Sequence, residues 1–311
     1  MKSNISKFLS LFSLIIICFY LINNPSSYEA LIKINTRTII IIVSVKFFTL
    51  LLNSLFNFEI LKVFRLKLGI FEAIYLSSLT FVGNFYLPGK SGASLRLLYL
   101  NKKYNFKSPE LTSIFFYFVF ITTFLSSFFG LISLLLINNR NVILKIGSLS
   151  ILSIIFISSF YILKKNYALK NFPKSKISQW VNETKKNWNI LSSEQNLLLK
   201  LVTITGVNFF LFATEIAIIF NYLFKDLAIL EILYYNSLSV FSSLLSITPA
   251  SLGIKEFIIL ISNDLLGVSL ENLISVLIIE RAISIVFSII PLFFIFVLSL
   301  IHISEPTRQL C

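Results

Sequence analysis

Long apolar runs separated by short polar segments dominate the hydrophobic pattern of this chain. The runs that we expect to cross a membrane are 8–22, 38–56, 68–87, 111–137, 142–163, 197–223, 227–247 and 273–297. A transmembrane helix needs roughly 20 mostly apolar residues, so shorter runs at 93–100 and 254–266 suit re-entrant or interfacial elements. The pattern predicts an all-α integral membrane protein with about eight transmembrane helices and two re-entrant or broken helices.

Each of the two short runs follows a break made of a proline, three residues and a glycine. "FYLPGKSGASLRLLYL" contains Pro88, Gly89 and Gly92, and "ITPASLGIKE" contains Pro249 and Gly253. Proline ends a helix, and glycine permits tight turns and close approach of backbones. Non-helical backbone at membrane depth has to line a cavity enclosed by protein or filled with water, because lipid cannot satisfy its polar groups. We therefore expect both breaks to line such a cavity.

Basic residues set the expected orientation through the positive-inside rule. With a cytoplasmic N-terminus, the cytoplasmic segments contain Lys2, Lys7, Lys62, Arg65, Lys67, Lys102, Lys103, Lys107 and the lysines of segment 164–196. The exterior loops then contain Lys33, Arg37, Arg140 and Lys225. This bias holds only if the two short runs turn back without crossing.

The two halves of the chain repeat one pattern. A single sequence separation relates four pairs of residues: Pro88 with Pro249, Gly92 with Gly253, Ser108 with Ser269, and Glu110 with Glu271. Each Ser-x-Glu is expected to start a helix, with the hydroxyl capping backbone N–H groups and the acid meeting the positive helix end. Because the first unit starts from the cytoplasm and the second from outside, we predict an inverted repeat, which in transporters surrounds the substrate site.

A basic segment joins the halves of one membrane domain that covers residues 1–297. The halves are about 1–163 and 197–297, and the linker 164–196 carries seven lysines and two glutamates. Its apolar residues fit an amphipathic helix at the membrane interface, whereas a solvated basic linker is the alternative. Residues 298–311 resemble a translated sequencing adapter, which predicts a non-native tail; a genuine polar tail is the other interpretation.

Composition narrows the chemistry further. The chain is 56% hydrophobic and 13% charged, with a net charge of +13. Its basic residues lie between the apolar runs, where such residues set the membrane topology and interact with anionic lipid headgroups. We therefore predict membrane lipids as partners, anionic or sugar-linked, and no nucleic acid. With two cysteines and one histidine, we expect no disulfide framework, no metal site and no cofactor.

Charged residues inside the apolar runs are functional candidates, because a charge in lipid is costly. The candidates for substrate binding are Lys90, Arg96, Glu215, Lys255, Glu256, Glu280 and Arg281. Lys90 and Arg96 flank a free helix end, a setting that favours phosphate. For Arg281 the alternative is a structural pair with Glu280 or Glu256, and for Glu215 it is a pair with a lysine. Lys46 is expected to snorkel toward an interface, and the Phe-rich stretch 113–129 to face lipid.

The motifs "PGKSGASLRLLYL" and "TPASLGIKEFIILISNDLLGVSLENLISVLIIERAIS" resemble those of the transmembrane region of lysylphosphatidylglycerol synthases, a flippase-like family of prokaryotic membrane proteins. The resemblance covers residues 68 to about 291. The matching positions are Pro88, Gly89, Gly92, Arg96, Pro249, Gly253, Glu256, Gly267 and Arg281. Ala93 stands where the family often has an acid. The resemblance implies a multi-pass protein of the plasma membrane that moves lipids or lipid-linked sugars between leaflets.

Three classes of function are compatible with these features. The leading interpretation is a flippase for a phospholipid or lipid-linked molecule. The alternative is a membrane-embedded, glycosyltransferase-like enzyme with a lipid-phosphate donor, although Asp occurs only at Asp226 and Asp264 and no catalytic residues can be assigned. The third is an accessory subunit, for which charged breaks at matching positions are not needed.

Overall fold

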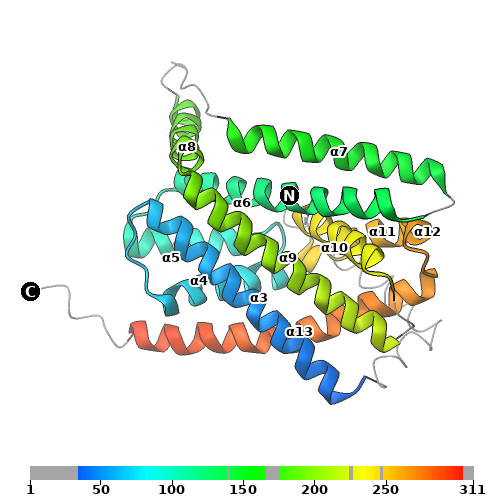
Figure 1. Cartoon of the computed structure of the whole chain (residues 1–311). Coiled ribbons are helices and arrows are strands. Elements are labelled where there is room, and N and C mark those ends of the chain that lie inside the picture. Colours follow the sequence, from blue (N-terminus) through cyan, green and yellow to red (C-terminus); the bar gives the residue numbers. More distant parts are fainter. Residues whose placement is uncertain (1–33, 139–140, 166–174, 224–226, 246–247, 304–311) are drawn as a thin grey trace, which may run out of the picture.

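A computed structural model describes residues 34–138, 141–165, 175–223, 227–245 and 248–303, with no side chains described beyond residue 297. Helices make up almost all of this described part (Figure 1). In chain order they are α3 (Thr36–Val63), α4 (Ile70–Tyr86), α5 (Ser91–Tyr104), α6 (Ser108–Leu136), α7 (Val142–Lys164), α8 (Lys176–Ser193), α9 (Gln195–Leu223), α10 (Ile229–Leu244), the 3₁₀ turn η1 (Pro249–Ser251), α11 (Ile254–Ile261), α12 (Asn263–Leu266) and α13 (Leu270–Ile303).

Five helices within the described ranges are long and apolar enough to cross a membrane: α3, α6, α7, α9 and α13. The expected class, an all-α membrane protein, is thereby confirmed. Helices α4 and α10 have 17 and 16 residues and are shorter than these five. The first expected crossing, 8–22, lies outside the described residues. The count of about eight crossings therefore stays a prediction.

The first short run folds as α5, which returns along α4 to form a helical hairpin. The two helices pack together. The Glu72 carboxylate in the first turn of α4 also binds side chains in the last turns of α5. It accepts hydrogen bonds from the hydroxyls of Tyr99 and Tyr104, each at 2.8 Å, and binds the Lys103 ammonium group at 2.9 Å. The ends of the hairpin are thereby held side by side, opposite the break at Pro88.

The second short run folds as α11 and α12, which pack back against α10. The hairpin is more irregular than the first, since a 3₁₀ turn precedes α11 and Ser262 separates α11 from α12. Gly267 ends α12 in the left-handed region at φ 66°. Each short apolar run that the sequence marks as too brief to cross is thus a helical return.

Helices of the two halves pack in corresponding pairs. α3 packs against α9, which is its counterpart in the second half. α4 packs against α13, and in the same way α10 packs against α6. The contacts of α3 with α13 are likewise matched by those of α9 with α6. These helices therefore have equivalent neighbours in the two halves.

Two separate apolar cores hold this arrangement together. One surrounds the first hairpin and contains Leu76, Leu100 and Tyr117, together with Leu201 of α9. The other surrounds the second hairpin and contains Tyr235, Ile259 and Leu266, with Ile42 of α3 and Ile279 of α13 among its other members. Helices α3, α6 and α9 contribute to both cores. They therefore join the surroundings of the two hairpins.

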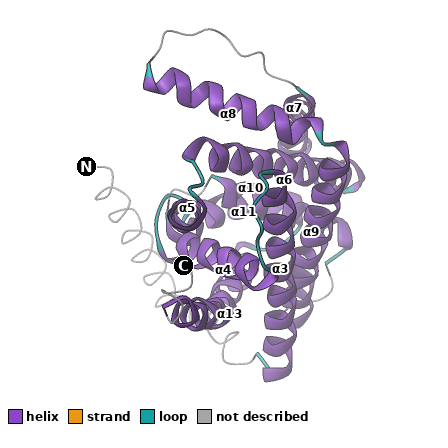
Figure 2. Ribbon diagram, turned by 90° about the vertical axis from the view of Figure 1, so that its left-hand side faces the viewer, coloured by secondary structure: helices purple, strands orange, loops and turns teal. Residues whose placement is uncertain are grey.

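Helices α7 and α8 lie on the outside of the bundle (Figure 2). α7 packs mainly against α6 and leaves most of its apolar side chains exposed, as expected for a helix that faces lipid. Within the basic segment, residues 176–193 form an amphipathic helix, as expected, and its position at the membrane interface stays a prediction. Trp188 and Leu191 are buried on its inner face, and the Trp188 indole donates to the Lys165 carbonyl at 3.1 Å.

The expected Ser-x-Glu helix start is correct in the second half and only partly correct in the first. Ser269 precedes α13, and its hydroxyl accepts the Asn272 N–H at 3.4 Å. Ser108 is instead the first residue of α6, and the N-cap is Lys107, whose N–H donates to Glu110 at 2.7 Å. The Glu110 carboxylate therefore accepts the backbone N–H at the start of α6, and the Ser108 hydroxyl is not needed as a cap.

Candidate functional site

The first break is a tight turn between α4 and α5. Gly89 and Lys90 both adopt left-handed backbone conformations, with φ of 68° and 55°. Gly92 then passes close to α4, where its N–H donates to Asn84 Oδ1 at 3.0 Å. A Cβ atom at Gly92 would lie 2.8 Å from that oxygen and would also collide with the Thr80 carbonyl. The hairpin can therefore close only if this position lacks a side chain.

The second break is an irregular turn around η1. Ala250, Ser251 and Gly253 have positive φ values of 49°, 57° and 86°. The Gly253 N–H donates to Glu256 Oε2 at 2.8 Å, so the acid satisfies the backbone at the start of α11. Such backbone conformations are costly for Ala and Ser and persist only where surrounding contacts fix them.

The turns of both breaks line one cavity of about 440 Å³. The first hairpin contributes Lys90, Ala93 and Arg96, and the second contributes Ala250 and Ser251 at its break and Lys255 of α11. Glu280, Arg281 and Ser284 of α13 line the cavity as well, together with polar side chains of α3 and aromatic side chains of α4 and α6. The sequence-based expectation that both breaks face a cavity agrees with this arrangement, and the cavity is shared.

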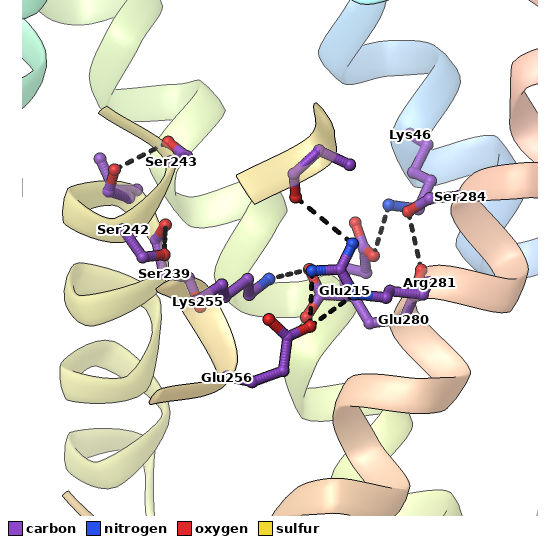
Figure 3. A network of polar contacts seen from close by, with 12 residues as sticks. Lys46, Glu215, Ser239, Ser242, Ser243, Lys255, Glu256, Glu280, Arg281 and Ser284 are labelled. Atoms are coloured by element: carbon purple, nitrogen blue, oxygen red, sulfur yellow. Dashed lines mark hydrogen bonds and ion pairs between the residues drawn. The ribbon is translucent and has the colours of Figure 1, made fainter. Parts of the chain in front are cut away.

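Three ion pairs connect the helices around the second break (Figure 3). Lys46 of α3 binds Glu215 of α9, with a distance of 2.7 Å between nitrogen and oxygen. Lys255 of α11 binds Glu280 of α13. Arg281 of α13 binds Glu256 of α11 at 2.5 Å. Because burying an unpaired charge costs far more than burying a pair, these contacts allow six charged groups inside the bundle.

Arg281 also connects α13 to the irregular backbone of the second break. Its Nη1 donates to the Ala250 carbonyl at 3.3 Å, while its Nε and Nη2 contact Glu256 Oε1. Of the two sequence-based interpretations of Arg281, the structure favours the pair with Glu256. Arg281 therefore holds the second break in position while its side chain lines the cavity.

The prediction that Lys46 snorkels toward an interface is wrong. The residue is 7% exposed, lines the cavity and is paired with the fully buried Glu215. α3 begins at Thr36, so at 1.5 Å per residue Lys46 lies about 15 Å along the helix axis, too far for its side chain to reach the helix end. For Glu215 the structure agrees with the alternative interpretation, in which this residue pairs with a lysine.

Arg96 and Lys90 differ from the other charged residues of the cavity. Arg96 is 8% exposed, and its Nη1 donates to Asn57 Oδ1 at 2.5 Å. The Asn57 amide in turn donates to Ser77 at 2.8 Å. The Lys90 ammonium group lies over the Phe115 ring, 5.8 Å from its centroid, where the ring face attracts a cation. Arg96 is thus held by a hydrogen bond to an amide and Lys90 lies against an aromatic ring, whereas the other cations of the cavity contact carboxylates.

The structure brings the sequence-predicted residues together in one place. Five of them line the cavity directly: Lys90, Arg96, Lys255, Glu280 and Arg281. Glu215 and Glu256 join them through their ion pairs. Sequence reasoning missed Lys46 and Asn57, although both are polar residues within the long apolar helix α3, which is itself a signal.

The Phe-rich stretch 113–129 does not only face lipid, as expected from its sequence. Phe115 and Phe118 line the cavity, whereas Phe116 and Phe128 are exposed on the outer side of α6. An α-helix has 3.6 residues per turn, so neighbouring phenylalanines point to different sides. The cavity therefore has aromatic as well as charged walls.

A family model described as "Lysylphosphatidylglycerol synthase TM region" matches residues 6–291. This chain belongs to the lysylphosphatidylglycerol synthase transmembrane-region family. The match contains both breaks and every residue that lines the cavity. No curated protein and no solved structure matches the chain significantly. Membership in this family, together with the five apolar helices of the chain, establishes a multi-pass membrane protein of lipid-related function.

Proposed function

We propose that this member of the lysylphosphatidylglycerol synthase transmembrane-region family moves a phospholipid or a lipid-linked molecule between the leaflets of a bilayer. The observation that carries the proposal is the shared cavity, because charged and polar side chains line it inside a bundle with an apolar exterior. A headgroup can lie among such side chains while its acyl tails stay in the surrounding lipid. Charged side chains inside a membrane protein are costly and typically mark a functional site.

The arrangement of the two hairpins suggests how access alternates. Helices α3 and α9 run antiparallel, since Lys46 pairs with Glu215 and Glu59 pairs with Lys200. The α4–α5 hairpin follows the C-terminal end of α3 and the hairpin of α10 to α12 follows the C-terminal end of α9, so the two hairpins begin at opposite ends of the bundle. We interpret them as an inverted repeat whose breaks meet at the substrate site. Rocking of one unit against the other then opens the cavity to each side in turn.

Charge supports a cytoplasmic position for the end of the bundle near α8. This end has Lys62 at the end of α3 and Lys102 and Lys103 at the end of α5, in addition to the lysines of α8. The positive-inside rule assigns such an end to the cytoplasm. With the first apolar run as a further crossing, the N-terminus is also cytoplasmic, and we place the protein in a prokaryotic plasma membrane.

Reconstitution in liposomes tests this function. Headgroup-intact phospholipids with a fluorescent acyl chain are incorporated in both leaflets, and a membrane-impermeant quencher reports those that reach the outer leaflet. We expect wild-type protein to raise the fraction of quenched lipid above the half found in empty vesicles. Arg281→Ala should lower the rate about tenfold or more, because the second break loses its contacts to α13.

The matched control is Ile154→Ala, on the exposed face of α7, which should transport lipid at the wild-type rate. Equal quenching in protein-containing and empty vesicles, for a panel that includes polyprenyl-phosphate lipids, would contradict the proposal. Equal rates for wild type and Arg281→Ala would exclude the cavity as the route.

A further inference from the structure

The charges that line the cavity do not balance. Five cationic side chains line it: Lys46, Lys90, Arg96, Lys255 and Arg281. Three of these are paired with Glu215, Glu280 and Glu256. Within the described part of the chain, Lys90 and Arg96 have no carboxylate at ion-pair distance. Both belong to the first hairpin, so the excess positive charge lies on one side of the cavity.

Arg96 has donors left over. It is more than nine-tenths buried, and among the described residues only its Nη1 donates to a neighbour, the side-chain oxygen Oδ1 of Asn57. Its Nε is buried without a hydrogen-bond partner there. A guanidinium group has five N–H donors in a planar fork that fits phosphate oxygens. A buried donor without a partner is costly, and a bound anion would remove this cost.

The cavity wall around Arg96, as far as the structure describes it, contains no compensating acid. Ala93 lies three residues earlier on the same face of α5 and lines the same cavity, but it is apolar. The nearby lining residues Asn57, Ser77 and Asn84 are polar and uncharged. A zwitterionic headgroup would leave the excess charge in place, whereas a headgroup with a net negative charge would reduce it.

We propose that Arg96 and Lys90 form a phosphate subsite that selects headgroups with a net negative charge. This inference rests on the proposed function and names its class of substrate: a lipid whose phosphate is not balanced by a cationic group of its own. The phosphate lies between the tip of the first hairpin and α3, with Arg96 as a donor of paired hydrogen bonds and Lys90 as a second positive charge.

A binding experiment tests the subsite separately from transport. Native mass spectrometry of the full-length protein compares phosphatidylglycerol with phosphatidylcholine of the same acyl chains, because both have a phosphodiester and differ in net charge. We expect phosphatidylglycerol to bind roughly tenfold more tightly, as charge-assisted hydrogen bonds predict. Ala93→Asp places a carboxylate beside Arg96 and should abolish this preference, whereas the matched control Ala93→Asn should keep it.

Each outcome decides the proposal. Equal binding of the two lipids, or equal effects of Ala93→Asp and Ala93→Asn, would overturn it. Strong competition by millimolar inorganic phosphate, without lipid preference, would overturn the lipid assignment in favour of free phosphate. If the two lipids bind equally but the vesicle assay still shows translocation of both, only the subsite is wrong. If phosphatidylglycerol binds selectively but no lipid is moved, the proposed function fails while the subsite stands.

Discussion

At the scale of single residues, the pair of Lys46 and Glu215 is the most buried of the described ion pairs that join the two halves. Glu215 is 0% exposed and Lys46 is 7% exposed, and they connect α3 with its counterpart α9. Removing one partner leaves a buried charge that nothing compensates, whereas removing both leaves an apolar contact. The pair is therefore expected to behave very differently in single and double variants.

Lys46→Met and Glu215→Leu should each destabilise the protein by about 3 kcal/mol, and the double variant should cost clearly less than the sum of the two. Thermal unfolding in detergent, compared across the double-mutant cycle, measures the coupling. Lys200→Met is the matched control, because it breaks the exposed pair of Lys200 with Glu59 at 3.3 Å and should cost less than about 1 kcal/mol. Additive effects of Lys46→Met and Glu215→Leu would contradict the assignment of this pair.

Residue chemistry was partly predictable from the sequence. A charge in an apolar run has to find a partner, and Glu215, Glu280 and Arg281, which this principle singled out, all form ion pairs. It could not choose between partners: Arg281 pairs with Glu256, whereas the adjacent Glu280 pairs with Lys255. That choice depends on which side of α13 each residue occupies relative to α11, and a sequence does not fix the rotation of a helix.

At the scale of elements, the first hairpin depends on the contact between Gly83 of α4 and Gly92 of α5. A Cβ at Gly83 would lie 2.5 Å from the Gly92 Cα, and backbone atoms cannot yield as a flexible side chain can. Gly92→Ala should therefore separate the two helices and destabilise the protein by about 1–3 kcal/mol. Gly147→Ala on α7 meets no atom within 4 Å and should be neutral or slightly stabilising.

Thermal unfolding and the lipid-binding assay check this prediction together. Because Arg96 lies on α5, displacement of α5 by Gly92→Ala should also weaken binding of phosphatidylglycerol, whereas Gly147→Ala should not. Equal stability of the two variants would show that the close approach of α4 and α5 is not needed for folding.

The order of the helices and the positions of the two breaks could be predicted from the sequence more accurately than the helix starts and the burial of single helices. Pro88 and Pro249 correctly marked the breaks, and each short run forms helices that pack back against the helix before the break. The start of α6 was misjudged by one residue, because a carboxylate can cap a helix start without the preceding hydroxyl. The amphipathic helix α8 could not be separated from a solvated linker, since its burial depends on contacts with α6 and α9 that the local pattern does not reveal.

At the scale of the whole molecule, the two hairpins lie in separate apolar cores and share one cavity with charged and aromatic walls. Rigid cores on both sides of a cavity suit motion of one unit relative to the other, because packed interiors resist continuous deformation. The repeat in the sequence anticipated matching elements and a site between the two breaks, whereas the side chains that line the shared cavity could not be deduced from it. Sequence separation relates positions along the chain and does not say which counterparts meet.

The central claim is that this cavity is reached from both sides of the membrane in turn. Accessibility of a single introduced cysteine tests it most directly, in a background with Cys18 and Cys311 replaced by serine. The test variant is Ser284→Cys on the cavity wall, and the control is Ile154→Cys on the lipid-facing side of α7. A charged, membrane-impermeant thiol reagent is applied to sealed vesicles from the inside or the outside.

We predict that the thiol of the Ser284→Cys variant reacts from both sides and that the thiol of the Ile154→Cys variant reacts from neither. Reaction of the Ser284→Cys variant from one side only, as in an enzyme with a fixed entrance, would contradict transport through this cavity.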